Sequence, residues 1–271
     1  MSDRSPAGKR NPALRHLREL RRDRRLRDAE RAMVAEGLHL VGEALTADAP
    51  IRSVVWSARL LGSPGGLELL DGLRARDVPL LEADDEALVA AQDARSAQPI
   101  VAIVERPETP PEPREGAPLW VVAEGVQDPG NLGAMIRSAD AAGATMFYAT
   151  GNGADLYHPR TIRGTMGSIF RLPVRFGDAG RVAAALSEDG ILRLGTVRRG
   201  GIPYDRFDLG QPLALFFGSE GSGLSESLRQ GLDAQLCIPM SPGVESLSVS
   251  AASAALLFEA ARQRRVAAQD S

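Results

Sequence analysis

The sequence predicts an α/β protein of two domains. Segments with helical periodicity alternate with short apolar strands, a proline-rich stretch interrupts this alternation, and the pattern then restarts. With 271 residues, the chain has the length of two ordinary domains. We therefore expect a small α/β domain over residues 1–105, a linker over 106–118 and a second α/β domain over 119–271.

The first domain is expected to begin with a basic surface helix. Residues 13–34 favour a helix, in which Leu14, Leu17, Leu20 and Leu26 form one narrow apolar stripe among arginines. Residues 1–32 hold eleven lysines and arginines against five acids and carry +6, whereas the rest of the chain carries −9. The remaining elements expected in this domain are helices over 37–46, 66–76 and 84–91 and strands over 51–56, 78–81 and 99–104.

The linker, RPETPPEPREGAP, contains five prolines, which can neither continue a helix nor join a central strand. Beyond it we expect strands over 119–123, 145–149, 172–176, 191–196, 213–217 and 235–239, and helices over 131–142, 159–165, 179–186, 225–231 and 247–265. Because a crossover element follows each strand, the second sheet should be parallel.

Composition excludes several classes of protein. The apolar share of 44% and the charged share of 25% are those of an ordinary globular protein, not of a disordered or fibrous one. A single cysteine, Cys237, cannot form an intrachain disulfide, and no cluster of Cys and His provides zinc ligands. No apolar run is long enough to span a bilayer, and the polar start does not resemble a secretory signal. We therefore expect a cytoplasmic protein without a bound metal.

Three segments of the second domain place glycine and polar residues directly after an apolar strand, where open α/β sheets bind ligands. The first, VQDPGNLGAMIRSADAAG, contains Asn131, which suits a helix N-cap, and Arg137, about one and two-thirds turns further on. Taken alone, these two residues are most simply a cap and a solvated side chain.

The second segment, LALFFGSEGSGL, runs from a strand into a glycine-rich turn that contains Glu220. It is not a dinucleotide-binding loop, because no G-x-G-x-x-G opens a helix here. In the third, CIPMSPGVESLSVS, the serines suit the start of the terminal helix, and Cys237 suits a small core residue better than a nucleophile. No Ser-His-Asp or Cys-His arrangement can be argued from the spacing.

In this order and at these separations, the three segments resemble the signature motifs of the SpoU/TrmH branch of the SPOUT methyltransferases. The resemblance covers about residues 117–265 and includes the connecting stretch 155–170. It implies a C-terminal domain tied in a deep trefoil knot, a rare feature that periodicity cannot reveal, and a homodimer. It also implies transfer of a methyl group from S-adenosylmethionine to a ribose 2′-hydroxyl of structured RNA.

The resemblance carries over to individual residues. Those that match the family's catalytic positions are Asn131, Arg137, Glu220 and Ser246, and those that match its cofactor-binding positions are Gly218, Ile238, Met240 and Leu247. A guanidinium stays protonated at any working pH and is a poor base. We therefore expect Arg137, positioned by Asn131, to grip a phosphate and stabilise the emerging alkoxide, while the proton leaves to a phosphate oxygen or water.

Residues 11–104 resemble, more loosely, the substrate-binding module of rRNA-directed members, which is shaped like a small ribosomal protein. This module favours rRNA over tRNA as the substrate. The residues expected to contact RNA phosphates are Arg18, Arg21, Arg22, Arg24, Arg25 and Arg163.

One position departs from the family pattern. Ser248 stands where most members have Asn, and a serine is shorter and lacks the amide pair. This departure leaves open a SPOUT-fold protein that binds RNA without turnover. A tRNA 2′-O-methyltransferase also stays open as an alternative to one that acts on rRNA. A Rossmann-type methyltransferase does not match, since no glycine-rich loop follows the first strand of a domain.

Overall fold

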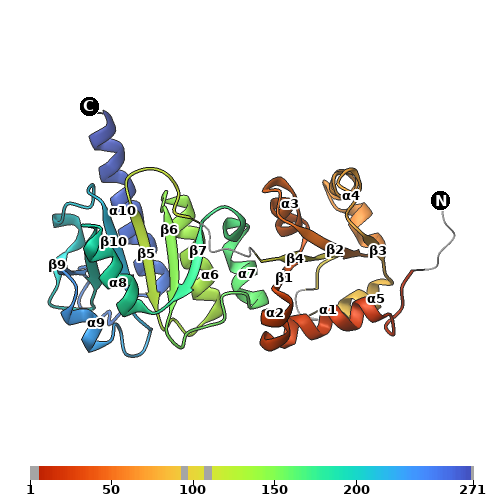
Figure 1. The fold of residues 1–271 in the computed structure, drawn as a ribbon, viewed down its shortest axis with the longest axis horizontal. Coiled ribbons are helices and arrows are strands. Elements are labelled where there is room, and N and C mark those ends of the chain that lie inside the picture. The colour runs from red at the N-terminus through yellow and green to blue at the C-terminus, as the bar shows by residue number, and fades with distance from the viewer. Residues whose placement is uncertain (1–5, 93–96, 107–111, 270–271) are drawn as a thin grey trace. The chain divides into compact units, whose positions relative to one another are not determined.

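The computed structural model describes residues 6–92, 97–106 and 112–269. It divides into two compact units, shown in Figure 1. The first comprises Met1–Glu108 together with Tyr157–Phe170, and the second comprises Thr109–Leu156 and Arg171–Ser271. Three of the linker prolines, at 107, 110 and 111, lie outside the described residues.

The first unit is built on a mixed four-stranded sheet of order β1-β4-β2-β3. β4 is antiparallel to both neighbours, and β2 and β3 are parallel. Its elements are α1 (Pro12–Arg22), α2 (Arg24–Glu30), β1 (Ala32–Glu36), α3 (Leu38–Thr46), β2 (Ile51–Trp56), η1 (Ala58–Gly62), α4 (Gly66–Ala75), β3 (Leu80–Glu82), α5 (Asp85–Ala91), β4 (Ile100–Glu105), α7 (Pro159–Thr165) and η2 (Ser168–Phe170).

Two apolar clusters form the core of this unit. One contains side chains of α3, α4, β2 and β4, and the other contains side chains of α1, α5 and alternate positions of the strands. Leu14, Leu17 and Leu20 are fully buried in the second cluster, which confirms the apolar stripe expected on the basic helix.

The expectation of one helix over residues 13–34 is wrong. Asp23 ends α1 and caps α2, because its Oδ1 accepts hydrogen bonds from the backbone N–H groups of Arg25 (2.8 Å) and Leu26 (3.4 Å). Arg31, in the left-handed region at φ 51°, ends α2. The next residues form β1, whose side chains are all buried. Its pairing with β4, distant in sequence, decides its conformation.

The second unit is built on a seven-stranded sheet of order β7-β6-β5-β10-β8-β11-β9, in which every pairing is parallel, as expected. The two-residue strand β9 was not expected. The elements are β5 (Leu119–Glu124), α6 (Pro129–Ala141), β6 (Met146–Thr150), β7 (Val174–Gly177), α8 (Ala179–Glu188), β8 (Leu192–Thr196), β9 (Ile202–Pro203), η3 (Tyr204–Arg206), β10 (Leu213–Phe217), α9 (Glu226–Gln230), β11 (Ala234–Cys237) and α10 (Val249–Gln269).

The order of the strands locates a ligand site. The chain leaves β5 through α6 toward β6, but it leaves the adjacent strand β10 through α9 toward β11, in the opposite direction along the sheet. The loops that follow β5 and β10 therefore diverge at the carboxyl edge, which is where open α/β sheets bind ligands. α8 and α9 lie on one face of the sheet and α6 lies on the other, where it packs against α10 (Figure 1).

The segment that connects β6 to β7 belongs to the first unit. Ile162 of α7 is fully buried in that unit's core, and Tyr157, Ile169 and Phe170 pack against it. The backbone supports this packing, since Gly167 has φ +92° and any side chain there would meet Glu43. None of the helices in the described ranges has the length and apolar character to span a membrane.

Candidate active site

Asn131 connects all three of the segments with unusual chemistry. Its Nδ2 donates a hydrogen bond of 3.0 Å to Oε1 of Glu220, in the second segment. Its Oδ1 accepts a hydrogen bond of 2.8 Å from Oγ of Ser250, in the third. The expectation that Asn131 caps the helix is wrong. Asp128 is the N-cap of α6 and accepts from the backbone N–H of Asn131, so the amide of Asn131 points to the neighbouring loops instead.

Glu220 is held as a carboxylate by the loops around it. Oε2 accepts a hydrogen bond of 3.3 Å from the backbone N–H of Gln127, and Oε1 accepts from Asn131. Burial acts to raise the pKa of Glu220, but the hydrogen bonds from the Asn131 amide and from backbone N–H groups outweigh it and lower the pKa below its usual value. The site therefore contains a fixed negative charge at neutral pH.

The glycine-rich turn after β10 requires glycine at its first position. A Cβ atom on Gly218 would lie 2.0 Å from the carbonyl carbon of Gly223 and 2.1 Å from the nitrogen of Leu224. The backbone groups of Ser219 and Gly223 exchange hydrogen bonds of 3.2 and 3.0 Å, and Gly223 has φ +71°. This close approach of the backbone to itself shapes one wall of a pocket.

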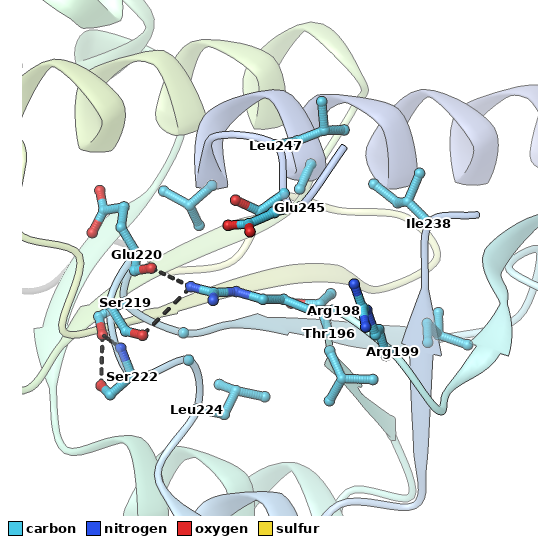
Figure 2. Close-up of a pocket in the computed structure, with 18 of the residues that line it drawn as sticks. Thr196, Arg198, Arg199, Ser219, Glu220, Ser222, Leu224, Ile238, Glu245 and Leu247 are labelled. Carbon is cyan, nitrogen blue, oxygen red and sulfur yellow. Dashed lines mark hydrogen bonds between the residues drawn. The ribbon is translucent and has the colours of Figure 1, made fainter. Parts of the chain in front are cut away.

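The pocket at this edge of the sheet has a volume of about 380 Å³ (Figure 2). Of the eight residues expected in the site, six line it: Gly218, Glu220, Ile238, Met240, Ser246 and Leu247. Asn131 reaches the pocket only through Glu220. Apolar side chains form much of the remaining wall, from Leu224, Leu236, Val249 and Leu256.

Ser248, the position that departs from the family pattern, caps the terminal helix. Its Oγ accepts a hydrogen bond of 3.2 Å from the backbone N–H of Ala251, and its carbonyl oxygen accepts from Ala252. Serine and asparagine are equally good N-caps. The neighbouring Ser250, not Ser248, bonds to Asn131.

Arg137 does not join the pocket of its own chain. It is exposed on α6 and makes no hydrogen bond or ion pair with the residues that the structure describes. The structure leaves this guanidinium available to a partner outside the chain.

The loop after β8 also lines the pocket, and sequence reasoning missed it. The loop contributes Val197, Arg198 and Arg199, and the last residue of β8, Thr196, lies beside them in the lining. Arg198 donates hydrogen bonds from Nη2 to the carbonyl oxygens of Glu220 (2.5 Å) and Gly221 (3.4 Å), so it reaches across the pocket to the glycine-rich turn (Figure 2). A signal was present, because Arg-Arg-Gly-Gly follows a strand whose carboxyl end lies at the same edge of the sheet.

The arginines expected to bind RNA fall into two groups. Arg22 and Arg25 are exposed, and Arg24 makes an exposed ion pair of 3.5 Å with Asp28. By contrast, the side chain of Arg21 is only 13% exposed and is paired with Glu36, which is 4% exposed. The remaining two are Arg18, which donates to the carbonyl oxygen of Ala90, and Arg163, which lies in α7 of the same unit.

Within the described ranges, no cluster of His, Cys, Asp and Glu could hold a metal ion.

Comparison with known proteins agrees with this arrangement. Residues 118–258 match the model of the SpoU rRNA Methylase family, and residues 11–102 match the MRM3-like substrate binding domain. The chain is 31% identical to the 23S rRNA (uridine(2479)-2′-O)-methyltransferase of Streptomyces viridochromogenes, over 97% of this chain and 95% of that protein. It is also 31% identical to the 23S rRNA (guanosine(2553)-2′-O)-methyltransferase RlmP of Bacillus subtilis, over 82% and 86% of the two chains.

The fold is likewise that of a solved member. The crystal structure of the SpoU methyltransferase AviRb from Streptomyces viridochromogenes, in complex with the cofactor AdoMet, superposes with a TM-score of 0.85. The match has 30% sequence identity and covers 94% of this chain and 99% of that one. With both of its parts matched and the motif residues gathered at one edge of the sheet, the chain belongs to the SpoU rRNA methylase family.

Proposed function

We propose that this protein transfers a methyl group from S-adenosylmethionine to a ribose 2′-hydroxyl of ribosomal RNA. The observation that carries the proposal is the junction at Asn131, where the three motif segments are hydrogen-bonded to one another beside the pocket. The relatives named above, which methylate 23S rRNA at a ribose 2′-oxygen, support the substrate class.

The pocket suits the proposed cofactor. Its volume of about 380 Å³ lies in the range of small-molecule sites. An apolar wall that includes Leu236 and Ile238 fits a nucleoside, and the charged side chains of Glu220, Glu245 and Arg198 fit a charged amino-acid tail. Gly218, Ile238, Met240 and Leu247 would hold the cofactor, largely through main-chain groups. When bound, S-adenosylmethionine supplies an electrophilic methyl group and its own leaving group.

The protein's own contribution is to bind and align the RNA. In our proposal Arg137 grips a phosphate next to the target ribose and stabilises the alkoxide as the hydroxyl loses its proton to a phosphate oxygen or water. Asn131 holds Glu220 and Ser250, and Glu220 and Ser246 orient groups of the substrate at the mouth of the pocket.

Residues 1–105, with the segment 157–170 that packs in the same unit, would select the RNA. Residues 106–118 would act as a linker, and the rest of 119–271 would form the knotted catalytic domain. The exposed Arg22, Arg24 and Arg25 would make phosphate contacts, with Arg18 and Arg163 in the same unit. Arg21 belongs with these in sequence, but its buried pairing with Glu36 assigns it to the stability of the unit instead.

We further propose that the enzyme is a homodimer. Two apolar side chains of the catalytic unit, Leu247 (45% exposed) and Phe258 (47% exposed), lie in the motif loop and on α10 and would be covered by a second copy. Phe258→Glu should then yield monomers in sedimentation velocity. Phe176→Glu, at an even more exposed position on β7, should leave the dimer intact. A wild-type monomer at micromolar concentration would overturn this assembly.

A single experiment tests the reaction and its substrate. The protein is incubated with methyl-labelled S-adenosylmethionine and, separately, with unmodified rRNA and unmodified tRNA, and labelled 2′-O-methyl nucleotides are mapped. We expect label at one rRNA position. Label in tRNA alone would show that the first unit does not direct the enzyme to ribosomal RNA. Cofactor binding without label in either RNA would show a non-catalytic RNA-binding protein.

A further inference from the structure

The pocket contains a guanidinium that no matched motif position accounts for. Arg198 lies two residues beyond the end of β8, and its side chain extends across the pocket toward the glycine-rich turn, whereas Arg199 does not reach that turn (Figure 2). Its Nη2 is held by the carbonyl oxygens of Glu220 and Gly221. The guanidinium is therefore fixed in place by the backbone before any ligand binds.

The guanidinium of Arg198 has N–H donors that no hydrogen bond in the described part of the chain uses. A guanidinium carries five N–H groups, and both hydrogen bonds of Arg198 come from Nη2. Nε and Nη1 have no partner within the part of the chain that the structure describes. Both forks of a guanidinium include Nη2, which is occupied here, so the free Nε or Nη1 can each donate a single charge-assisted hydrogen bond to a carboxylate.

The charged residues that line the pocket match the charged groups of the proposed cofactor. Among the lining residues that the structure describes, the cations are Arg198, Arg199 and Arg229, and Arg229 is already paired with Glu226. The acids are Glu220 and Glu245. The proposed cofactor carries two positive groups, the sulfonium and the amine, and one negative group, its carboxylate. The acids suit the positive groups, and the guanidinium of Arg198 suits the carboxylate.

We propose that Arg198 binds the carboxylate of the methionine part of S-adenosylmethionine and thereby makes the pocket selective for the intact amino-acid tail. This inference rests on the proposed function. Arg198 is a specificity-determining residue here, because its contact is with a part of the cofactor that takes no part in methyl transfer. Arg198 also stabilises the glycine-rich turn through its hydrogen bonds to the carbonyl oxygens of Glu220 and Gly221. An experiment therefore has to separate carboxylate binding from stabilisation of the turn.

Binding calorimetry with S-adenosylmethionine and with its decarboxylated form separates the two roles of Arg198. Decarboxylated S-adenosylmethionine keeps the nucleoside, the sulfonium and the amine but lacks the carboxylate. We expect the wild-type protein to bind the intact cofactor about 10-fold more tightly than the decarboxylated form. In Arg198→Met, the Kd for the intact cofactor should rise about 10-fold, and the preference should fall below about 2-fold. Arg198→Lys should retain part of the preference, because it keeps the positive charge but loses the guanidinium's hydrogen bonds to the turn.

Arg199→Met is the matched control and should keep the wild-type preference. If Arg198→Met weakens both ligands by the same factor, Arg198 only braces the turn and the inference is overturned. Loss of the preference in Arg199→Met with its retention in Arg198→Met would assign the carboxylate to Arg199. If the wild-type protein binds S-adenosylmethionine and its decarboxylated form equally tightly, only this inference is overturned. If the wild-type protein binds neither ligand, the proposed function is overturned as well.

Discussion

The side-chain amide of Asn131 donates to the carboxylate of Glu220 at 3.0 Å, and this hydrogen bond joins the loop after β5 to the loop after β10. The two residues are 89 positions apart in the chain. Because β5 and β10 are neighbours in the sheet, this hydrogen bond lies between the two loops that diverge at its carboxyl edge. The hydrogen bond from Ser250 to Asn131 connects the same two loops to the start of α10.

Replacing Asn131 should impair turnover more than folding. Asn131→Ala removes the hydrogen bonds to Glu220 and Ser250 and frees both loops, so we expect kcat to fall by about 10- to 100-fold through lost alignment. The measurement is single-turnover methyl transfer with saturating cofactor. Gln230→Ala, which removes an amide–carboxylate hydrogen bond of 2.7 Å with Glu226 on the surface of α9, is the control and should retain full turnover. Equal rates in the two variants would contradict the role given to Asn131.

Glu220 should make stability depend on pH. Its pKa is lower in the folded protein than its usual value of 4.5, so its hydrogen bonds stabilise the folded state fully above that value. This contribution is lost as the pH falls through the lowered pKa. The free energy of unfolding of Glu220→Gln should therefore be smaller than that of the wild type at pH 7, and the two should converge as the pH is lowered below 4.5. Urea titrations across this range measure the difference, and a constant gap would refute the assignment.

Arg137 should act on the RNA and not on the cofactor. Because it is exposed and absent from the pocket lining, Arg137→Lys should leave the Kd for S-adenosylmethionine unchanged. Its kcat should fall by about 100-fold, since lysine cannot make the bidentate phosphate contact. Calorimetry and single-turnover rates give the two values. Arg181→Lys, an exposed arginine on α8, serves as the control and should change neither. Near-normal turnover of Arg137→Lys would count against its proposed role.

Neighbouring arginines of the first unit should give opposite phenotypes. Arg22→Ala and Arg25→Ala remove exposed charges, so each should weaken RNA binding and lower the slope of log K against log salt by about 1. Arg21→Ala instead leaves Glu36 buried without its partner and should lower the free energy of unfolding by about 3 kcal/mol. Salt-dependent RNA titrations and urea unfolding separate the effects. A stable Arg21→Ala protein with the largest loss of RNA affinity would reverse the assignment.

Gly218 should tolerate no side chain. In Gly218→Ala the new methyl would lie about 2 Å from the backbone of Gly223, so the turn has to open. We expect a loss of at least about 2 kcal/mol in unfolding free energy and weakened binding of S-adenosylmethionine, both measurable on the purified variant. Gly221→Ala is the control, because a Cβ there meets no neighbouring atom.

Local patterns predicted most of the elements but not the boundaries that depend on distant partners. The helix periodicity of residues 13–34 hid the strand β1, whose Ala32–Glu36 is determined by pairing with β4 about seventy residues later. The side-chain preferences at Asn131 also misled, because asparagine and aspartate are both good N-caps and the helix uses Asp128. The family resemblance, not the periodicity, identified six of the residues that line the pocket.

The sequence by itself determined the α/β class, the parallel second sheet and the motif residues, because these follow from local spacing, composition and resemblance. Only the tertiary structure decided which arginines are available to RNA and that α7 packs in the first unit. It also decided that Arg198 enters the pocket. These facts depend on burial and on contacts between residues far apart in the chain, and no local pattern in the sequence specifies which distant groups will meet.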